Sequence, residues 1–257
     1  CIQQYAKEEG DERCAKKYGQ LVWDIISYIS DSKHPNLIVD DNGLVKTDGS
    51  ERAVTWMNST ANGRPVVPRT GYIVEFNALW YNALCFGAKL AQEAHHDDLA
   101  TSLNQQADKT KDAFLTTFVN KFGYLFDYVD GDKQDWSVRP NMIFPAAFDY
   151  SPLSQEQKKN IIDICTKELL TPKGLRSLSP KSGGYNPMYV GPQAQRDYAY
   201  HQGTAWPWLF GFYVEACLKL YKRTRLSFIE RQMVGYDDEM FCHCVGTLPE
   251  LFDGNPP

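Results

Sequence analysis

Apolar residues recur at helical spacing along most of this 257-residue chain, and this periodicity limits the fold more than any other feature. Side chains at positions i, i+4 and i+8 fall on one face of an α-helix, so each such run predicts a helix with one buried stripe. Leu21, Ile25 and Ile29 follow this spacing. Similar runs predict helices over residues 73–94 and 97–120. We therefore expect a mainly helical chain.

The second half of the chain continues the same pattern. Ser154 and Gln157 have the spacing of a capping box, in which both side chains satisfy free backbone amides at a helix start. Apolar runs over 161–169 and 209–220 predict two helices, and a weaker run covers 224–241. The predicted fold class is all-α.

Two long stretches, 32–72 and 171–203, separate the helices and are rich in Gly, Pro, Ser, Tyr and Arg. Within the first, residues 37–45 predict a small β-hairpin, because Asn42-Gly43 supplies the positive φ angles of a tight turn. Long ordered loops usually carry function. We expect a toroid of helices with a loop-built face, forming one domain over residues 1–257 with small β-hairpins in its loops.

Charge and cysteine usage exclude several classes of protein. The net charge is −5 and no long basic run occurs, which disfavours a nucleic-acid partner. No apolar run approaches the roughly 18–20 residues that span a bilayer, so no membrane partner is expected. The seven cysteines fit no paired framework, which favours a reducing compartment and predicts a cytoplasmic protein. Nothing in the sequence specifies an oligomeric state.

The loops concentrate the side chains that recognise sugars. Indole rings match the apolar face of a sugar ring, and carboxylate, amide and guanidinium groups match its hydroxyls. The alternative is that these aromatic residues fill the core or hold loops together. The candidate substrate-binding residues are Trp56, Arg69, Glu75, Asn77, Arg139, Asn141, Asp197, His201, Trp206 and Trp208.

Glycoside hydrolysis requires two carboxyl groups that flank the scissile bond. Three acidic residues are candidates from their surroundings: Glu250 between apolar residues and a turn, Glu75 at a helix start, and Asp197 near His201. Each has a plainer alternative. Glu75 could cap its own helix, and Asp197 could orient His201 or Arg196.

No metal or cofactor is expected. Cys242-His243-Cys244 and His95-His96 lack the second ligand pair that a zinc site needs. The sequence contains no phosphate-binding loop, nucleophile elbow or dinucleotide fingerprint.

Several segments together resemble the C-terminal domain of glycogen debranching enzymes, the amylo-α-1,6-glucosidase domain. In order, they are Thr55-Trp56-Met57-Asn58, Arg64 to Gly71, Val74 to Leu84, Arg139-Pro140-Asn141, Leu170 to Leu178, Arg196 to Trp208 and Glu250-Leu251-Phe252-Asp253-Gly254. The resemblance implies an (α/α)6 barrel that hydrolyses α-1,6-linked glucose stubs with inversion. It also implies an α-glucan partner, adds Arg176 to the sugar-contacting candidates, and implies further helices before Cys1 and after Pro257.

The resemblance also implies catalytic roles, and one of them is interrupted. The family's general base matches Glu250, whereas its general acid is an Asp where this chain has Asn58. An amide has no titratable proton to give to a leaving oxygen near neutral pH. Asn58 is then a natural departure that weakens or abolishes catalysis, an introduced substitution, or a sign that another acid donates the proton.

Three functions follow from these observations. The first is a debranching-type glycosidase, and the second is an α-glucan-binding domain that does not turn over its ligand. The third is a related helical-barrel glycosidase of the glucoamylase or trehalase type, which would prefer small disaccharides to branched dextrins.

Overall fold

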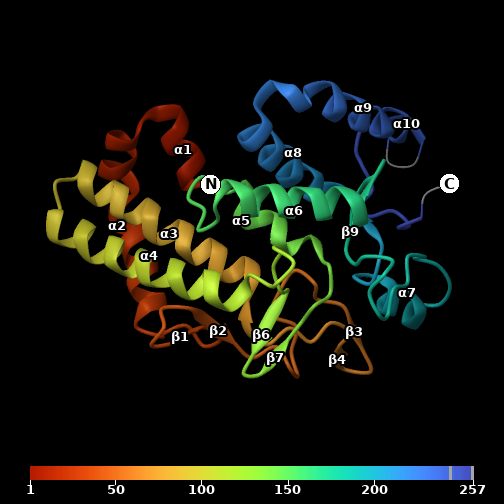
Figure 1. The fold of residues 1–257 in the computed structure, drawn as a ribbon, viewed down its shortest axis with the longest axis horizontal. Helices are drawn as coiled ribbons and strands as arrows, with labels where there is room; N and C mark the ends of the chain where they lie inside the picture. The colour runs from red at the N-terminus through yellow and green to blue at the C-terminus, as the bar shows by residue number, and fades with distance from the viewer. Residues whose placement is uncertain (243–244, 256–257) are drawn as a thin grey trace.

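The computed structural model describes residues 1–242 and 245–255, and helices dominate it (Figure 1). His243 and Cys244, from the Cys-His-Cys sequence considered above, lie outside the described residues. The helices are α1 (Ile2–Glu9), α2 (Asp11–Ser30), α3 (Val74–Glu93), α4 (Asp97–Phe118), α5 (Ile143–Ala147), α6 (Gln155–Glu168), α7 (Gln193–Ala199), α8 (Pro207–Tyr221), α9 (Leu226–Asp237) and α10 (Glu239–Cys242), with 3-10 turns η1 (Pro140–Met142) and η2 (Lys222–Arg225).

The main helix predictions are confirmed. The runs over 73–94 and 97–120 correspond to α3 and α4, and the run over 209–220 lies in α8. The capping box at Ser154 is present in both directions, because the Gln157 amide donates to Ser154 Oγ and the Ser154 amide donates to Gln157 Oε1. The weaker run over 224–241 is divided among η2, α9 and α10.

Helix α3 joins two hydrophobic clusters. Its first turns place Val74 and Ala78 in a cluster with α4, α5, α6 and α8. Its later turns place Leu84 in a second cluster with α1, α2 and α4. The Trp23 indole of α2 donates a hydrogen bond to the Gly87 carbonyl, and a Cβ at Gly87 would lie 2.5 Å from Ile26. This close approach fixes the α2–α3 pair.

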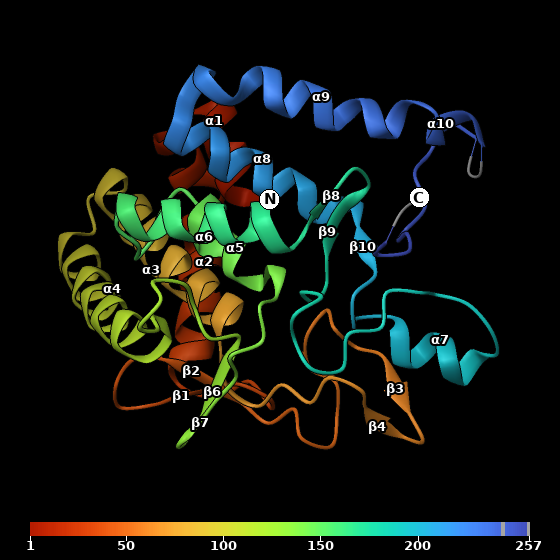
Figure 2. The same ribbon diagram turned by 45° about the vertical axis from the view of Figure 1, so that its right-hand side comes forward.

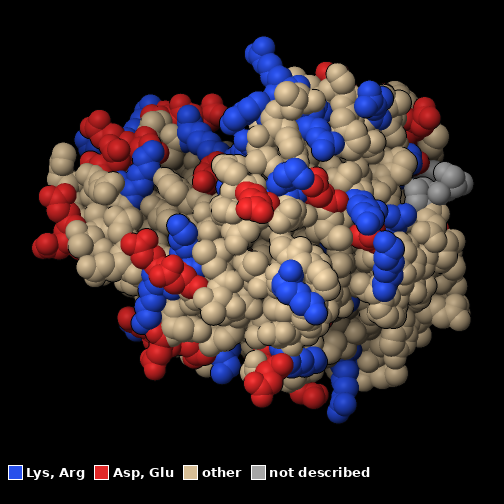
Figure 3. All heavy atoms as spheres, viewed as in Figure 1, with Lys and Arg blue, Asp and Glu red and all other residues tan. Residues whose placement is uncertain are grey.

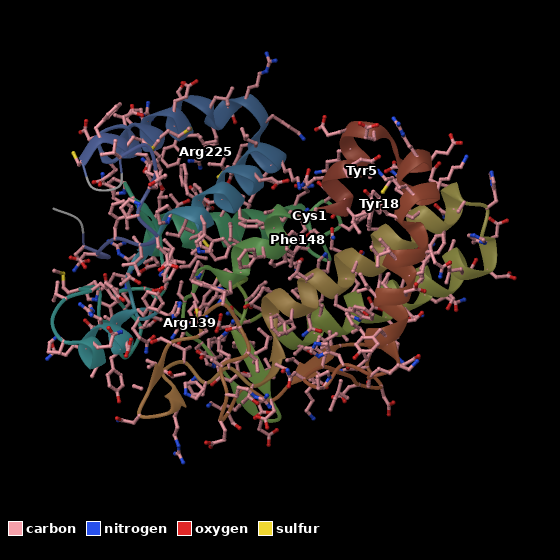
Figure 4. The ribbon with its side chains drawn as sticks, turned by 180° about the vertical axis from the view of Figure 1, so that it is seen from behind. Cys1, Tyr5, Tyr18, Arg139, Phe148 and Arg225 are labelled. Carbon is pink, nitrogen blue, oxygen red and sulfur yellow. The ribbon has the colours of Figure 1, made fainter. Side chains whose placement is uncertain are left out.

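Most helices lie in the upper part of the view, and the strands β1 to β7 lie below them (Figures 1 and 2). Strands β8, β9 and β10 lie beside α6 and α8, and α7 lies beside β3 (Figure 2). Helices α5, α6 and α8 pack together in the centre, and α9 lies above them. In Figure 4, Tyr5 and Tyr18 mark the α1–α2 corner, far from Arg225 at the start of α9. Phe148 follows α5 near the middle.

The strands do more than form local hairpins in the loops. They are β1 (Ile38–Val39), β2 (Val45–Thr47), β3 (Thr60–Ala61), β4 (Arg64–Pro65), β5 (Gly71–Ile73), β6 (Tyr128–Asp130), β7 (Lys133–Gln134), β8 (Leu170–Thr171), β9 (Gly174–Arg176) and β10 (Ala205–Trp206). Five of them make one antiparallel sheet in the order β1-β2-β5-β6-β7, and β10-β9-β8 make another. A Cβ at Gly71 would lie 2.4 Å from the Val129 carbonyl, so the β5–β6 contact requires glycine there.

The hairpin predicted over 37–45 is present, but its turn differs from the expectation. Val39 pairs with Val45. Only Gly43 of the Asn-Gly pair has a positive φ, of 86°. Asn42 instead accepts a hydrogen bond from the Leu44 amide through its side chain at 2.9 Å, so the turn needs a left-handed backbone at Gly43 but not at Asn42.

The long stretch 171–203 contains a helix that the sequence did not predict. Helix α7 spans only seven residues, Gln193–Ala199, and lacks a continuous apolar stripe, since only Ala199 is buried. It packs beside β3, so two stretches that are far apart in sequence meet. This meeting point lies at the right-hand edge of Figure 2.

The molecular surface carries mixed charge. On the face drawn in Figure 3, acidic and basic side chains alternate, and no continuous basic area is present there. Across residues 1–242 and 245–255, no helix has both the length and the apolar character that a bilayer crossing requires.

Candidate active site

A buried cluster of charges lies beneath the loops. Arg69 is 1% exposed and donates Nε to Asp127 Oδ2 at 2.7 Å. The same guanidinium pairs with both oxygens of Glu75, with Nη2 to Oε2 at 2.6 Å. Burial disfavours the charged form of Arg69, but the charges of Asp127 and Glu75 outweigh this effect and raise the Arg69 pKa. Glu75 lies in the first turn of α3, where the helix dipole also favours a negative charge.

The cluster extends to the aromatic surface through one amide. Asn141 donates Nδ2 to Asp127 Oδ1 at 2.7 Å and accepts from the Trp56 indole nitrogen at 2.7 Å. The chain of contacts therefore runs from the start of α3 to Trp56, two residues before Asn58. Charges that are buried and fully paired fix the groups that they bind.

Arg139 ties three loop segments together. It lies at the junction between the loop segments and the strands (Figure 4). Its Nη1 donates to the carbonyls of Ser177 and His201 at 3.1 and 2.9 Å, and its Nη2 donates to Gln202 Oε1 at 2.8 Å. Its Nε lies 3.9 Å from Asp127 Oδ2. The segment before β6, the segment after β9 and the segment after α7 are thus joined through one guanidinium.

Next to the buried charged cluster, aromatic rings surround Trp56. Its ring meets those of His201, Trp206 and Trp208 edge-on, with centroids 5.2 to 5.4 Å apart. The His201 and Trp206 rings stack 5.1 Å apart with an interplanar angle of 7°. Trp208 is 42% exposed, whereas Trp206 is buried. The edge of this cluster presents indole to solvent, as a sugar face requires.

His201 is neutral within the cluster. It is 1% exposed, and neither ring nitrogen has a hydrogen-bond partner among the described residues. Burial, with the nearby positive charges of Arg139 and Arg69, lowers its pKa to about 3. The imidazole therefore carries no charge near neutral pH.

Asn58 lies on one exposed edge of the site. It is exposed, between buried Met57 and buried Ser59. Ser59 Oγ donates to the Asp197 carbonyl at 2.5 Å, which holds the Asn58 segment against α7. The Asp197 side chain accepts from Gln193 at 2.7 Å, within α7 itself.

Glu250 lies on another exposed edge, and its carboxylate accepts a hydrogen bond from the Tyr200 hydroxyl. The following residues are anchored by their backbone. Phe252 and Ala205 exchange two backbone hydrogen bonds of 2.8 Å. Arg176 Nε donates to the Gly254 carbonyl at 2.7 Å.

The structure brings most of the predicted residues into one region, but at different depths. Trp56, Trp208, Asn58, Asp197 and Glu250 have exposed or half-buried side chains. Inside lie Arg69, Glu75, Arg139, Asn141, His201 and Trp206. Asn77 stands apart: it is 0% exposed, and its amide group bonds the backbone of Val45 and Ile73. Arg176 is half-buried, and its guanidinium donates hydrogen bonds to the carbonyls of Gly254 and Glu168.

The sequence did not single out two central residues. Asp127 carries no local signal among 32 acidic residues, because its partners Arg69 and Asn141 come from distant segments. Tyr200 lies in the aromatic window that the sequence drew attention to, but its bond to Glu250 joins residues 50 positions apart. Only the folded chain shows these pairings.

Two hollows elsewhere are less suited to a sugar. One of about 520 Å³ has mainly charged and polar walls, with Pro35 and Ile38 but no aromatic ring; its lining includes Lys46, Asp48, Glu51, Arg52 and Asp130. The other, of about 610 Å³, has mainly apolar walls, including Val22, Ile29, Leu79, Trp80 and Phe86. Neither combines a ring platform with several polar groups.

The fold is shared with known glycosidases. Neutral trehalase Nth1 from Saccharomyces cerevisiae superimposes with a TM-score of 0.59 and 15% identity, over 77% of this chain and 37% of that one. The GH63 mannosylglycerate hydrolase from Thermus thermophilus superimposes with a TM-score of 0.53 and 16% identity, over 73% of this chain and 41% of that one. A structure titled sialidase superimposes with a TM-score of 0.71 and 15% identity, over 95% of this chain and 22% of that one. These likenesses define a helix-rich fold of the kind that these glycosidases have.

More particularly, the chain belongs to the amylo-alpha-1,6-glucosidase family, whose sequence profile matches residues 1–257. The glycogen debranching enzyme of Saccharomyces cerevisiae is 26% identical over 68% of this chain. The chain spans 14% of the length of that relative.

Proposed function

We propose that this domain is a debranching-type glycosidase that hydrolyses α-1,6-linked glucose stubs of an α-glucan with inversion. The observation that carries the proposal is the convergence of Asn58 and Glu250 on one aromatic cluster, each on an exposed, separately anchored segment. The proposal includes an (α/α)6 toroid to which these helices contribute, a single domain over residues 1–257, and a cytoplasmic location.

In this proposal Glu250 is the general base. Its carboxylate takes a proton from water, and the resulting oxygen nucleophile attacks the anomeric carbon on the face opposite the leaving oxygen. The C–O bond to the branch breaks, and the leaving oxygen needs a proton. Asn58 stands where the proton donor is expected and has none to give. The base is present and the acid is missing.

The depth of each side chain suggests how the sugar-binding roles divide. Exposed Trp208 and half-buried Trp56 are suited to stack on glucose rings. Asp197 and Arg176 are accessible enough to meet hydroxyls. The buried members Arg69, Glu75, Arg139, Asn141, His201 and Trp206 are suited to support these exposed residues from below. Asn77 is suited to hold the backbone of Val45 and Ile73 in front of α3.

A substrate that needs no acid tests the proposal. Fluoride leaves α-glucosyl fluoride without protonation, so the protein with Asn58 should hydrolyse it and release β-glucose first, detectable by proton NMR. Glu250→Gln should lower the rate by about 10²–10⁴-fold, the usual contribution of a general base. Equal rates with and without the Glu250 carboxylate would refute the role of Glu250.

The exposed amide at position 58 also favours a second function, an α-glucan-binding domain without turnover. That function predicts binding of maltooligosaccharides by calorimetry together with no hydrolysis of glucosyl fluoride. Hydrolysis that depends on Glu250 would exclude it.

A further inference from the structure

Glu250 is exposed, and among the described residues the Tyr200 hydroxyl is the side-chain donor that holds it. An ionised carboxylate only accepts hydrogen bonds, so the tyrosine is the donor in this pair. No lysine or arginine of the described chain forms an ion pair with Glu250. Loss of this hydroxyl would remove the hydrogen bond that orients the glutamate side chain.

Tyr200 is itself fixed from several sides. Its ring packs against those of Tyr189, Trp206 and His201, with centroids 5.4, 5.1 and 4.6 Å away. Its carbonyl accepts from Thr204 Oγ1 at 2.6 Å. A donor held by packing in this way can orient the group that it binds.

We propose that Tyr200 is a positioning residue of the hydrolytic reaction, whose hydroxyl aims the Glu250 carboxylate at the attacking water. This inference rests on the proposed role of Glu250. Tyr200 touches neither the sugar nor the water in this account, and it acts only through the glutamate.

The charges around the pair are consistent with this role. Burial and the bond to Glu250 raise the pKa of Tyr200, so its hydroxyl keeps its proton near neutral pH. His201, which faces the same ring, is neutral. The other charged groups on or against the Glu250 segment have partners of their own. Asp253 accepts from the Tyr189 amide, Arg176 donates to the Gly254 carbonyl, and Lys173 lies over Phe252 and donates to Glu239.

The test is Tyr200→Phe, which keeps the ring and removes the donor. On α-glucosyl fluoride we expect kcat to fall about ten- to a hundredfold with little change in KM, the fold-change that matches loss of one hydrogen bond to a charged group. Tyr185→Phe is the matched control. It removes a hydroxyl that donates to Asn255 Oδ1 at 2.8 Å in the same segment, without touching the carboxylate. Its kcat should fall much less.

A double-mutant cycle separates positioning from general support of the fold. In Glu250→Ala, azide replaces the activated water: a C–N bond forms at the anomeric carbon as the C–F bond breaks and fluoride leaves. Adding Tyr200→Phe should then cost nothing further, because its target is gone. An undiminished cost in that background, or wild-type kcat for Tyr200→Phe alone, overturns the inference. Failure of the unmodified protein on glucosyl fluoride instead refutes the proposed function.

Discussion

The two edges of the candidate site are held by different physical means. Behind Asn58 lies a buried cluster in which Arg69, Glu75, Asp127 and Asn141 pair almost wholly with one another. Behind Glu250 lie a two-bond backbone bridge and a few side-chain hydrogen bonds near the surface. Buried charges are costly to unpair, whereas surface bonds are individually weak. The Asn58 edge should therefore control stability, and the Glu250 edge mainly activity.

Removal of Asp127 should have the largest effect on stability. Asp127→Ala leaves two buried guanidinium groups, Arg69 and Arg139, with Glu75 as the remaining carboxylate of the cluster, and it removes the oxygen acceptor of Asn141 Nδ2. We expect a loss of about 3–5 kcal/mol in the free energy of unfolding, measured by urea denaturation. The isosteric Asp127→Asn should lose less. A loss below about 1 kcal/mol for the alanine variant would show that the cluster does not anchor this edge.

The pH dependence of the unfolding free energy should reflect the protonation of His201. In the unfolded chain its pKa returns to about 6.5, whereas in the folded protein it is about 3. Between these values the unfolded state binds more protons, so the stability that is fully present above pH 6.5 is lost as the pH falls. The slope should be roughly 1.4 kcal/mol per pH unit.

His201→Gln should flatten this slope, whatever its effect on stability at neutral pH. The control is His95→Asn at an exposed position with a positive φ, which asparagine tolerates. An unchanged slope in His201→Gln would mean that another group titrates in this range.

The smallest change in stability is expected at the Glu250 edge. Arg176→Met keeps the aliphatic stem and removes the bond to the Gly254 carbonyl. We expect a loss of about 1 kcal/mol in unfolding free energy. The accompanying fall in kcat on glucosyl fluoride should be larger than the fall in Asp127→Asn. The reverse order of the two kcat values would contradict the division between the edges.

The sequence predicted the helices well because long apolar stripes are local signals, as in α3, α4 and α8. It did not predict α7, which has too few buried residues to show a period, or the pairing of β2, β5 and β6, which joins distant segments. At the site, residue type indicated chemistry but not depth. Arg69 and Asn77 have the same polar character as surface sugar ligands, yet their partners are buried protein groups.

The most direct test of the account is glucose release from a debranching limit dextrin, compared between the protein with Asn58 and Asn58→Asp. The leaving group of the dextrin is a sugar hydroxyl that must be protonated as it leaves, so the absence of a general acid should lower the rate by its full contribution. We expect almost no glucose from the Asn58 form and an increase of about 10²–10⁴-fold with the aspartate. Rapid release by the Asn58 form, unimproved by Asn58→Asp, would show that another residue donates the proton and would contradict the account.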